Sequence, residues 1–211
     1  MGEKMIYFLF TDTGTWLNRL INFYTKTTLN HVSIALDPAL REVYSFGRKH
    51  PDNPFRAGFV REDIGHHLLK NADCALYAYP MTEEEYEQIM GEIAIFKEKE
   101  DTFKYNFLGL FGVVLRVEWK REKAFFCSQF AAKLLGGLKD VRLGKPACFT
   151  TPADLRRLDG MRLIYRGKLG DYEPQQEKQE SRLAAGEQEA MSKPQSLFVS
   201  LSSKVKEFVI R

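Results

Sequence analysis

The chain has 211 residues, of which 44% are apolar and 28% are charged, and its formal net charge is +3. This length and apolar content suit one globular domain with a sizeable core, followed by a tail. The charge is too small and too evenly spread to indicate a nucleic-acid-binding protein, and the sequence has no zinc-finger spacing.

The cysteine count argues against a disulfide framework. Cys74, Cys127 and Cys148 cannot all pair within one chain, and none lies in a CxxC motif. They predict free thiols and a reducing compartment. The apolar run over residues 6–10 is too short for a signal peptide, and no run reaches the about 18–20 apolar residues of a membrane span. We therefore expect a cytoplasmic protein.

Regular apolar patterns in the N-terminal half predict four elements before a loop. They are a buried strand over residues 5–10, a helix over 16–24, and the two strands of a hairpin over 31–36 and 42–47. The next segment, residues 48–63, contains Pro51, Pro54 and Gly58 and predicts a long ordered loop.

The remainder of the domain predicts a strand, several helices and a final strand. These are a strand over 74–79, a helix from the Thr82 capping box to about residue 99, an apolar segment over 103–119 that is a buried helix or a helix plus a strand, a helix over 127–135, a short helix opened by Thr151-Pro152, and a strand over 161–165.

The composition changes near residue 171, which divides the chain into three parts. Residues 1–170 form the predicted domain. Residues 171–195 have few large apolar side chains and predict a disordered linker. Residues 196–211 carry apolar side chains at helical spacing and predict an amphipathic helix, which docks on its own domain or a partner more often than on a membrane.

Cys127 is the candidate nucleophile. It stands at the start of a predicted helix, where unpaired backbone N–H groups and the helix dipole favour a thiolate, and where its own N–H is placed to serve an oxyanion hole. Ser128 and Gln129 add polar groups to a first turn that a purely structural helix does not need. The alternative is a small buried hydrophobic residue, the usual environment of a free cysteine.

His31 is the candidate base. It shares its predicted strand face with Ser33 and Ala35, two small residues that leave room beside the ring. A histidine held near a cysteine takes the thiol proton and later returns it, which is the chemistry of nucleophilic catalysis. The alternative for a lone histidine is a satisfied core or surface residue.

The remaining histidines and cysteines predict no metal site and no cofactor. His50, His66 and His67 fall in or near predicted loops and are assigned to solvent. A zinc site from His66, His67 and Cys74 would lack a fourth ligand, and adjacent histidines point in different directions. Cys74 lies on a predicted strand and Cys148 in a loop, so both are interpreted as structural.

Two motifs together resemble a known superfamily. His31 in Asn30-His31-Val32-Ser33-Ile34-Ala35-Leu36, followed much later by Cys127 in Phe126-Cys127-Ser128-Gln129-Phe130, is similar to the circularly permuted branch of the NlpC-type papain-like superfamily. The YiiX-like proteins and the lecithin retinol acyltransferase-like enzymes belong to that branch, in which the His strand precedes the Cys helix. Tyr105-Asn106 and Thr151-Pro152-Ala153-Asp154-Leu155 add to the resemblance, which spans residues 5–167.

The resemblance implies an α+β fold and a third polar residue that orients the histidine. The expected fold is permuted papain-like: a curled antiparallel sheet, partly closed into a barrel, with the Cys127 helix packed against it. The third residue lies on the strand after the His, where this chain has Ser45 instead of the more usual acid. A serine accepts a hydrogen bond from the ring but does not stabilise an imidazolium as a carboxylate does. Glu62 is an alternative acid if the preceding loop folds back.

The resemblance and the Cys–His pair predict a cysteine hydrolase that forms an acyl-enzyme on the amide of a peptide, including a cell-wall-derived one. Tyr105, Ser128 and Glu62 are the candidates for the oxyanion hole or for substrate binding, although a tyrosine capping a core helix is an equal reading of Tyr105. A second hypothesis is a lipid-directed thiol acyltransferase or phospholipase-like enzyme, with peripheral membrane contact through residues 196–211. A third is a non-catalytic module that binds a peptide or acyl group.

Overall fold

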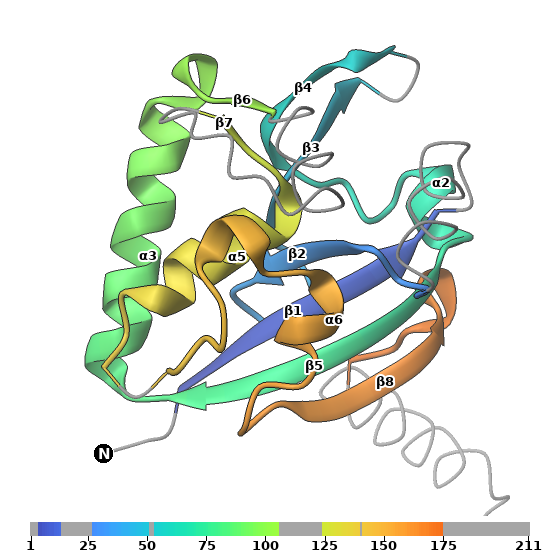
Figure 1. The fold of residues 1–211 in the computed structure, drawn as a ribbon. Helices are drawn as coiled ribbons and strands as arrows, with labels where there is room; N and C mark the ends of the chain where they lie inside the picture. Colours follow the sequence, from blue (N-terminus) through green and yellow to red (C-terminus); the bar gives the residue numbers. More distant parts are fainter. Residues whose placement is uncertain (1–3, 14–26, 51–52, 106–123, 140, 175–211) are drawn as a thin grey trace, which may run out of the picture. The chain divides into compact units, whose positions relative to one another are not determined.

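The computed structural model describes residues 4–13, 27–50, 53–105, 124–139 and 141–174 (Figure 1). The chain divides into one compact unit, Met1–Tyr172, and a second unit, Glu173–Arg211. The predicted helix over 16–24, most of the apolar segment over 103–119, and nearly all of the predicted linker and C-terminal helix lie outside the described residues.

One eight-stranded sheet forms the centre of the described fold. Its strands are β1 (Lys4–Asp12), β2 (His31–Ala35), β3 (Val43–His50), β4 (Asn53–Arg61), β5 (Asp73–Met81), β6 (Lys104–Tyr105), β7 (Ala124–Phe125) and β8 (Arg162–Lys168). They are ordered β7-β6-β4-β3-β2-β1-β5-β8, and neighbours are antiparallel except for β6 and β7.

The sheet is open, so the expected partial barrel is not formed within the described residues. β7 and β8 stand at opposite ends of the strand order. The outer strand β8 exposes Arg162, Arg166 and Lys168, and charged side chains of this kind keep an edge strand in solvent rather than paired. Antiparallel strands accompanied by separate helices give the predicted α+β class.

Capping residues mark where the helices begin. The described ones are α2 (His67–Lys70), α3 (Glu83–Glu98), α5 (Cys127–Gly136) and α6 (Pro152–Leu155), with short 3-10 turns at η1 (Glu100–Thr102), η2 (Ala147–Phe149) and η3 (Leu169–Asp171). The predicted capping box of α3 is confirmed, because Thr82 Oγ1 accepts from the Glu85 N–H and the Glu85 carboxylate accepts from the Thr82 N–H. The short helix predicted at Thr151-Pro152 is α6.

The segment over residues 48–63 is mostly strand, so the predicted long loop is wrong. β3 continues to His50, and β4 covers Asn53–Arg61. Proline and glycine favoured a loop here, but Gly58 has a different role. A Cβ at Gly58 would lie 2.8 Å from the main-chain oxygen of Phe103. The glycine therefore permits a close approach within a strand instead of marking a turn.

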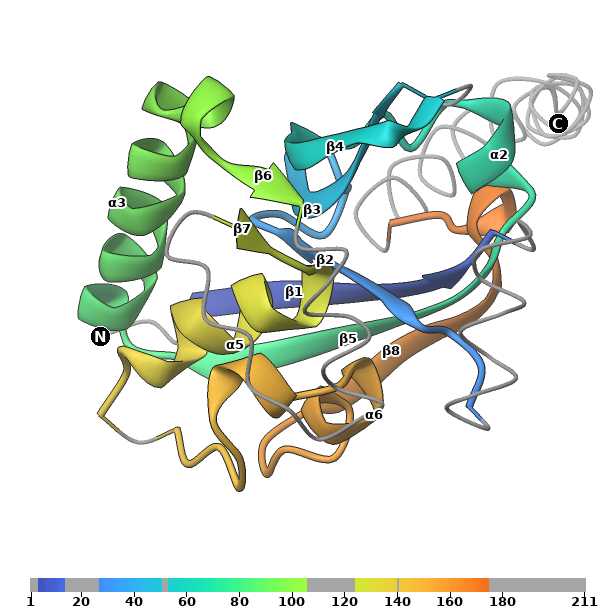
Figure 2. The same ribbon diagram turned by 45° about the horizontal axis from the view of Figure 1, so that its top comes forward.

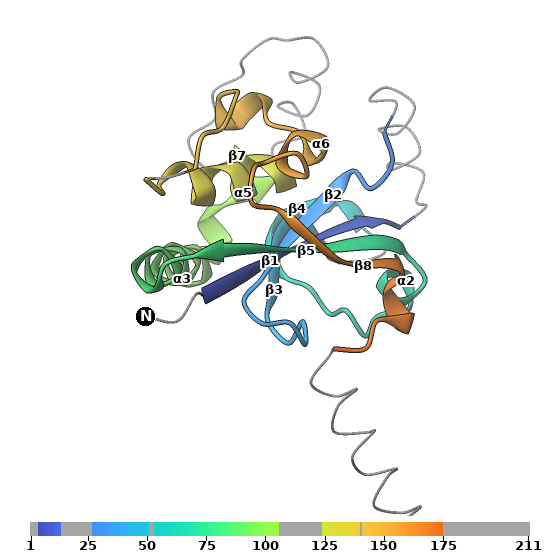
Figure 3. The same cartoon turned by 90° about the horizontal axis from the view of Figure 1, so that it is seen from below.

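Two apolar layers cover the two faces of the sheet, as strand alternation requires. The larger layer lies under α3 and α5 and includes Phe8, Val32 and Phe130. The smaller layer, on the opposite face, includes Leu9, Ala35 and other buried side chains. Figure 2 shows α5 lying across β1 and β2, and Figure 3 shows α5 and α6 on one side of β5 and β8.

Candidate functional site

His31 and Glu62 form the central contact of the site. Nε2 of His31 lies 2.6 Å from Oε1 of Glu62, and the two side chains are only 21% and 8% exposed. Glu62 follows β4 directly, and its N–H donates to the Val43 carbonyl at 2.8 Å. Val43 is the partner of Ala35 on β2. Glu62 therefore shares a sheet face with Ala35, and with His31 four residues earlier on the same strand.

Two buried serines hold the Glu62 carboxylate. Ser33 Oγ donates to Oε2 at 2.9 Å, and Ser45 Oγ donates to Oε1. The sequence predicts Ser45 as the group that orients the His31 ring. The structure places it one step further away, because the ring contacts the Glu62 carboxylate and Ser45 contacts that carboxylate. The acid that the sequence offered only as an alternative is the residue beside His31.

The charged forms of His31 and Glu62 stabilise each other. Burial lowers the pKa of His31, but the Glu62 carboxylate and the Cys127 side chain outweigh burial, so that the pKa lies well above its usual 6.5. Burial raises the pKa of Glu62, but the charge of His31 and hydrogen bonds from His31, Ser45 and Ser33 lower it below its usual 4.5. Each group therefore favours the charged form of the other, and the raised pKa makes the His31 ring a stronger base.

Cys127 is the first residue of α5 and is 6% exposed. Phe126 is the N-cap and supplies no capping side chain, and the first main-chain bond of the helix runs from the Phe130 N–H to the Phe126 carbonyl. The N–H groups of Cys127, Ser128 and Gln129 precede that bond, and the first turn holds no acidic residue. This setting favours an oxyanion beside the thiol.

The Cys127 thiol lies against Asn30 and His31. Its Sγ is 3.8 Å from the Asn30 carbonyl oxygen, to which the thiol donates, and Cys127 is near enough to His31 to raise the pKa of that ring. Nε2 of His31 faces Glu62. His31 thus lies between a carboxylate that it contacts and a candidate nucleophile close by, an order of groups that suits proton transfer from the thiol.

A tight turn fixes the residues before His31. Leu29 has a φ of 59°, a left-handed conformation that costs a non-glycine residue about 1–2 kcal/mol. Thr27 and Asn30 brace the turn: the Asn30 amide donates to the Thr27 carbonyl at 2.7 Å, and the Thr27 hydroxyl donates to Asn30 Oδ1 at 2.9 Å. The turn directs the Asn30 carbonyl toward Cys127 and sets the start of β2.

Arg156 holds the same turn from outside. This residue ends α6, and its Nη1 donates to the Thr28 carbonyl at 3.1 Å and to the Leu29 carbonyl at 3.5 Å. Its guanidinium lies 5.4 Å from the centre of the Phe10 ring. Sequence reasoning missed Arg156, because it binds main-chain oxygens of residues about 130 positions away and no local pattern marks such a contact.

Gly47 makes room beside the ring. A Cβ at this position of β3 would lie 3.3 Å from Ser45 Oγ and 3.6 Å from Cε1 of His31. The first distance is tighter than an ordinary van der Waals contact. The absence of a side chain at Gly47 therefore leaves the His31 ring and its serine neighbour undisturbed.

Ser128, a second oxyanion candidate, uses its hydroxyl away from this cluster. The Ser128 hydroxyl donates to the Thr150 carbonyl at 2.7 Å, and Ser128 is buried. It ties α5 to the segment ahead of α6, so its donor is already used. Tyr105 ends β6, where it pairs with Phe125 of β7; its side chain lies outside the described part of the structure.

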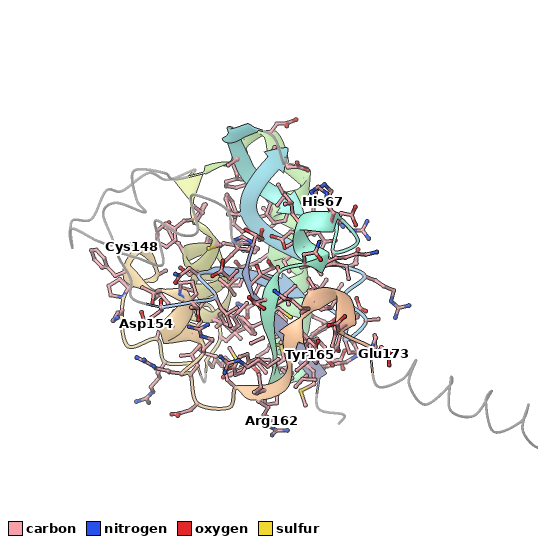
Figure 4. The ribbon with its side chains drawn as sticks, turned by 90° about the vertical axis from the view of Figure 1, so that its right-hand side faces the viewer. His67, Cys148, Asp154, Arg162, Tyr165 and Glu173 are labelled. Atoms are coloured by element: carbon pink, nitrogen blue, oxygen red, sulfur yellow. The ribbon has the colours of Figure 1, made fainter. Side chains whose placement is uncertain are left out.

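The remaining cysteines and histidines are separate from the site. Cys74 is buried on β5, and burial raises the pKa of its thiol to about 11. Figure 4 shows Cys148 on η2 at one side of the view and His67 at the other. His66 is not a free solvent residue as expected, because its Nδ1 accepts from the Leu68 N–H as the N-cap of α2. The described segments contain no group of three or more His, Cys, Asp or Glu placed to hold a metal ion.

Comparison with known proteins identifies no relative: no family model, curated protein or solved structure matches the chain. Within the described ranges, no helix combines the length and hydrophobicity needed to cross a membrane. The residues of the site are therefore the basis for its chemistry.

Proposed function

We propose that the protein is a cysteine hydrolase that cleaves an amide through an acyl-enzyme on Cys127. His31 acts as general base and general acid, and Glu62 orients the ring and stabilises its charged form. The observation that carries the proposal is the 2.6 Å contact between Glu62 and His31, in a ring whose pKa the neighbouring Cys127 also raises. A nucleophile, a base and an orienting third group in this sequence of contacts recur in acyl-transfer enzymes of unrelated fold.

The reaction proceeds in two stages. His31 accepts the thiol proton, and Sγ of Cys127 bonds to the carbonyl carbon of the substrate amide. The oxyanion forms beside the first-turn N–H groups of α5. His31 then gives its proton to the leaving amine as the C–N bond breaks, which leaves a thioester on Cys127. A water molecule, deprotonated by His31, attacks the carbonyl carbon of the thioester. The C–S bond breaks, the carboxylic acid leaves, and His31 returns the proton to Sγ of Cys127.

The permuted papain-like assignment of the fold belongs to the same proposal. Its support is the order of the elements: the His31 strand precedes the Cys127 helix, and that helix packs against an antiparallel sheet. The Glu62 carboxylate removes the weakness that Ser45 alone would give the site, because a carboxylate stabilises an imidazolium and a hydroxyl does not. This favours an enzyme over a binding module on the same scaffold, which needs no base oriented by a carboxylate.

The test is the iodoacetamide alkylation rate of each cysteine as a function of pH, followed by peptide mass analysis. We expect Cys127 to be alkylated rapidly at neutral pH, and His31→Ala to remove this reactivity. Cys74 is the internal control, because burial raises the pKa of its thiol to about 11. Equal, slow alkylation of Cys127 in both proteins would reject activation of Cys127 by His31 and favour the binding module.

Acyl-enzyme formation is tested separately with 4-nitrophenyl acetate. We expect one acetyl group on Cys127 and a matching burst of nitrophenol, both absent in Cys127→Ala. Cys74→Ala and Cys148→Ala are the matched controls and should keep the burst. A Cys127→Ala protein with full turnover would remove this residue from the mechanism.

A further inference from the structure

A hollow lies beside α6, and its lining includes none of Cys127, His31 and Glu62. Its volume is about 260 Å³, and three segments line it: the stretch over 142–145, Thr150, and the stretch over 154–159. Figure 4 shows Asp154, one of its lining residues, on the side of the molecule that carries Cys148. This volume falls below the roughly 300–1,000 Å³ of sites for drug-sized ligands, so it suits a small group.

One of the three cations in the hollow is already neutralised. Lys145 Nζ lies 2.9 Å from both carboxylate oxygens of Asp154. Asp154 also accepts from the N–H and the hydroxyl of Thr151 in the capping box of α6. Burial raises the pKa of Asp154, but Lys145 and Thr151 lower it further than burial raises it. The oxygens of this acid are therefore occupied by donors of the protein itself.

The other two cations are arginines whose charges are not matched. Arg142 and Arg157 line the hollow, and neither guanidinium has an ion-pair or hydrogen-bond partner among the described residues. Asp159 is the one further acid of the lining, so the five charged side chains sum to a positive charge. A guanidinium presents a planar fork of N–H donors that matches the paired oxygens of a carboxylate or phosphate.

Apolar side chains give the hollow a firm base. Leu143 and Leu158 line it, and both pack against the larger apolar layer of the fold. Thr150, a third lining residue, is buried, and its carbonyl accepts the Ser128 hydroxyl at 2.7 Å. The wall of the hollow is thus tied to α5 by a buried hydrogen bond, and its shape is set by the core rather than by a free loop.

We infer that this hollow is a binding site for a small oxyanion, with Arg142 and Arg157 as the residues that recognise it. The ligand class is a carboxylate or a phosphate group, free or at the end of a small molecule. The inference rests on the charge and lining of the hollow alone, and it stands whether or not Cys127 is a nucleophile.

The test is titration of the full chain with inorganic phosphate and, in a second arm, with acetate, followed by two-dimensional NMR or calorimetry. Ionic strength is held constant with chloride. We expect saturable binding of one of the two anions, weakened about tenfold by Arg142→Gln and by Arg157→Gln and lost in the double variant. The arm that binds more tightly separates a phosphate site from a carboxylate site.

Arg166→Gln is the matched control, because Arg166 is an exposed arginine on β8, outside the hollow. It removes the same charge and should leave the affinity unchanged. Three results would overturn the inference: no saturable binding above the chloride reference, unchanged affinity in the double variant, or an equal loss in Arg166→Gln. Circular dichroism of each variant establishes that a loss of binding is not a loss of fold.

Discussion

Glu62 is the residue on which the charge of the candidate site depends. Glu62→Gln keeps the shape of the side chain but removes the negative charge beside His31. We expect the free energy of unfolding near pH 6 to fall by about 1.5–3 kcal/mol, the range for a hydrogen bond to a charged group. The measurement is urea unfolding across a series of pH values.

The pH dependence of that loss follows from the two pKa shifts. The pKa of His31 is raised from 6.5, so its contribution is complete below pH 6.5 and disappears as pH rises through the raised value. The pKa of Glu62 is lowered from 4.5, so its contribution is complete above pH 4.5 and disappears as pH falls through the lowered value. The difference in the free energy of unfolding between the unmodified protein and Glu62→Gln should be largest between pH 4.5 and pH 6.5. Glu42→Gln is the control, and a pH-independent difference for Glu62→Gln would contradict the pairing.

Thr11 carries a buried hydroxyl that has no hydrogen-bond partner among the residues that the structure describes. Thr11 is fully buried on β1 opposite His31. An unsatisfied buried hydroxyl costs about 1–3 kcal/mol. Thr11→Val has the same shape without the hydroxyl, so we expect it to raise the free energy of unfolding by about 1 kcal/mol. A destabilised Thr11→Val protein would show that the hydroxyl is bonded in solution.

The sequence predicts His31 and Cys127 as site residues more readily than it predicts Glu62 as the acid beside His31. Short local patterns make His31 and Cys127 candidates, and the structure places Cys127 near enough to His31 to raise its pKa. The sequence favours Ser45 over Glu62, because the prolines and glycine before Glu62 predict a loop. One residue of register decides which face of a sheet a side chain occupies. The β3–β4 hairpin, with Tyr44 opposite Arg61, sets the register that brings Glu62 beside His31, and the sequence pattern over 48–63 does not display that hairpin.

At the scale of elements, α6 acts on the site through the turn before β2. Arg156 joins the two by donating to the carbonyls of Thr28 and Leu29, and Leu29 holds a left-handed conformation there. Removing the guanidinium removes these two hydrogen bonds, so that Leu29 can relax more easily toward an ordinary backbone conformation. His31 would then lose its fixed position relative to Cys127.

Arg156→Met keeps an unbranched apolar side chain and removes the guanidinium that donates to the turn and lies over Phe10. We expect the alkylation rate of Cys127 at pH 6 to fall about tenfold, equivalent to about 1.4 kcal/mol, and its pH profile to move toward that of a free thiol. Arg156→Lys, which restores the charge, should recover part of the rate. The exposed Arg166→Met is the control. An unchanged pH profile in Arg156→Met would limit this arginine to a structural role.

At the scale of the whole molecule, the last described residues close the first unit. Leu169 is buried in the smaller apolar layer. Tyr172 donates its hydroxyl to the Pro38 carbonyl at 2.9 Å and packs against Tyr165, with ring centres 5.1 Å apart. The sequence boundary at residue 170 was set by composition. The structural boundary after Tyr172 differs because Tyr172 belongs to the packing of the unit.

Two shortened chains test where the folded unit ends. A chain ending at Pro174 retains Leu169 and Tyr172, so we expect its free energy of unfolding and its Cys127 alkylation profile to match those of the full chain. A chain ending at Lys168 loses both side chains and should be destabilised by about 2–5 kcal/mol, the cost of removing a large buried apolar group. Urea unfolding measures both. If the chain ending at Pro174 lost the same stability, the second unit would be part of the folding unit that carries the site.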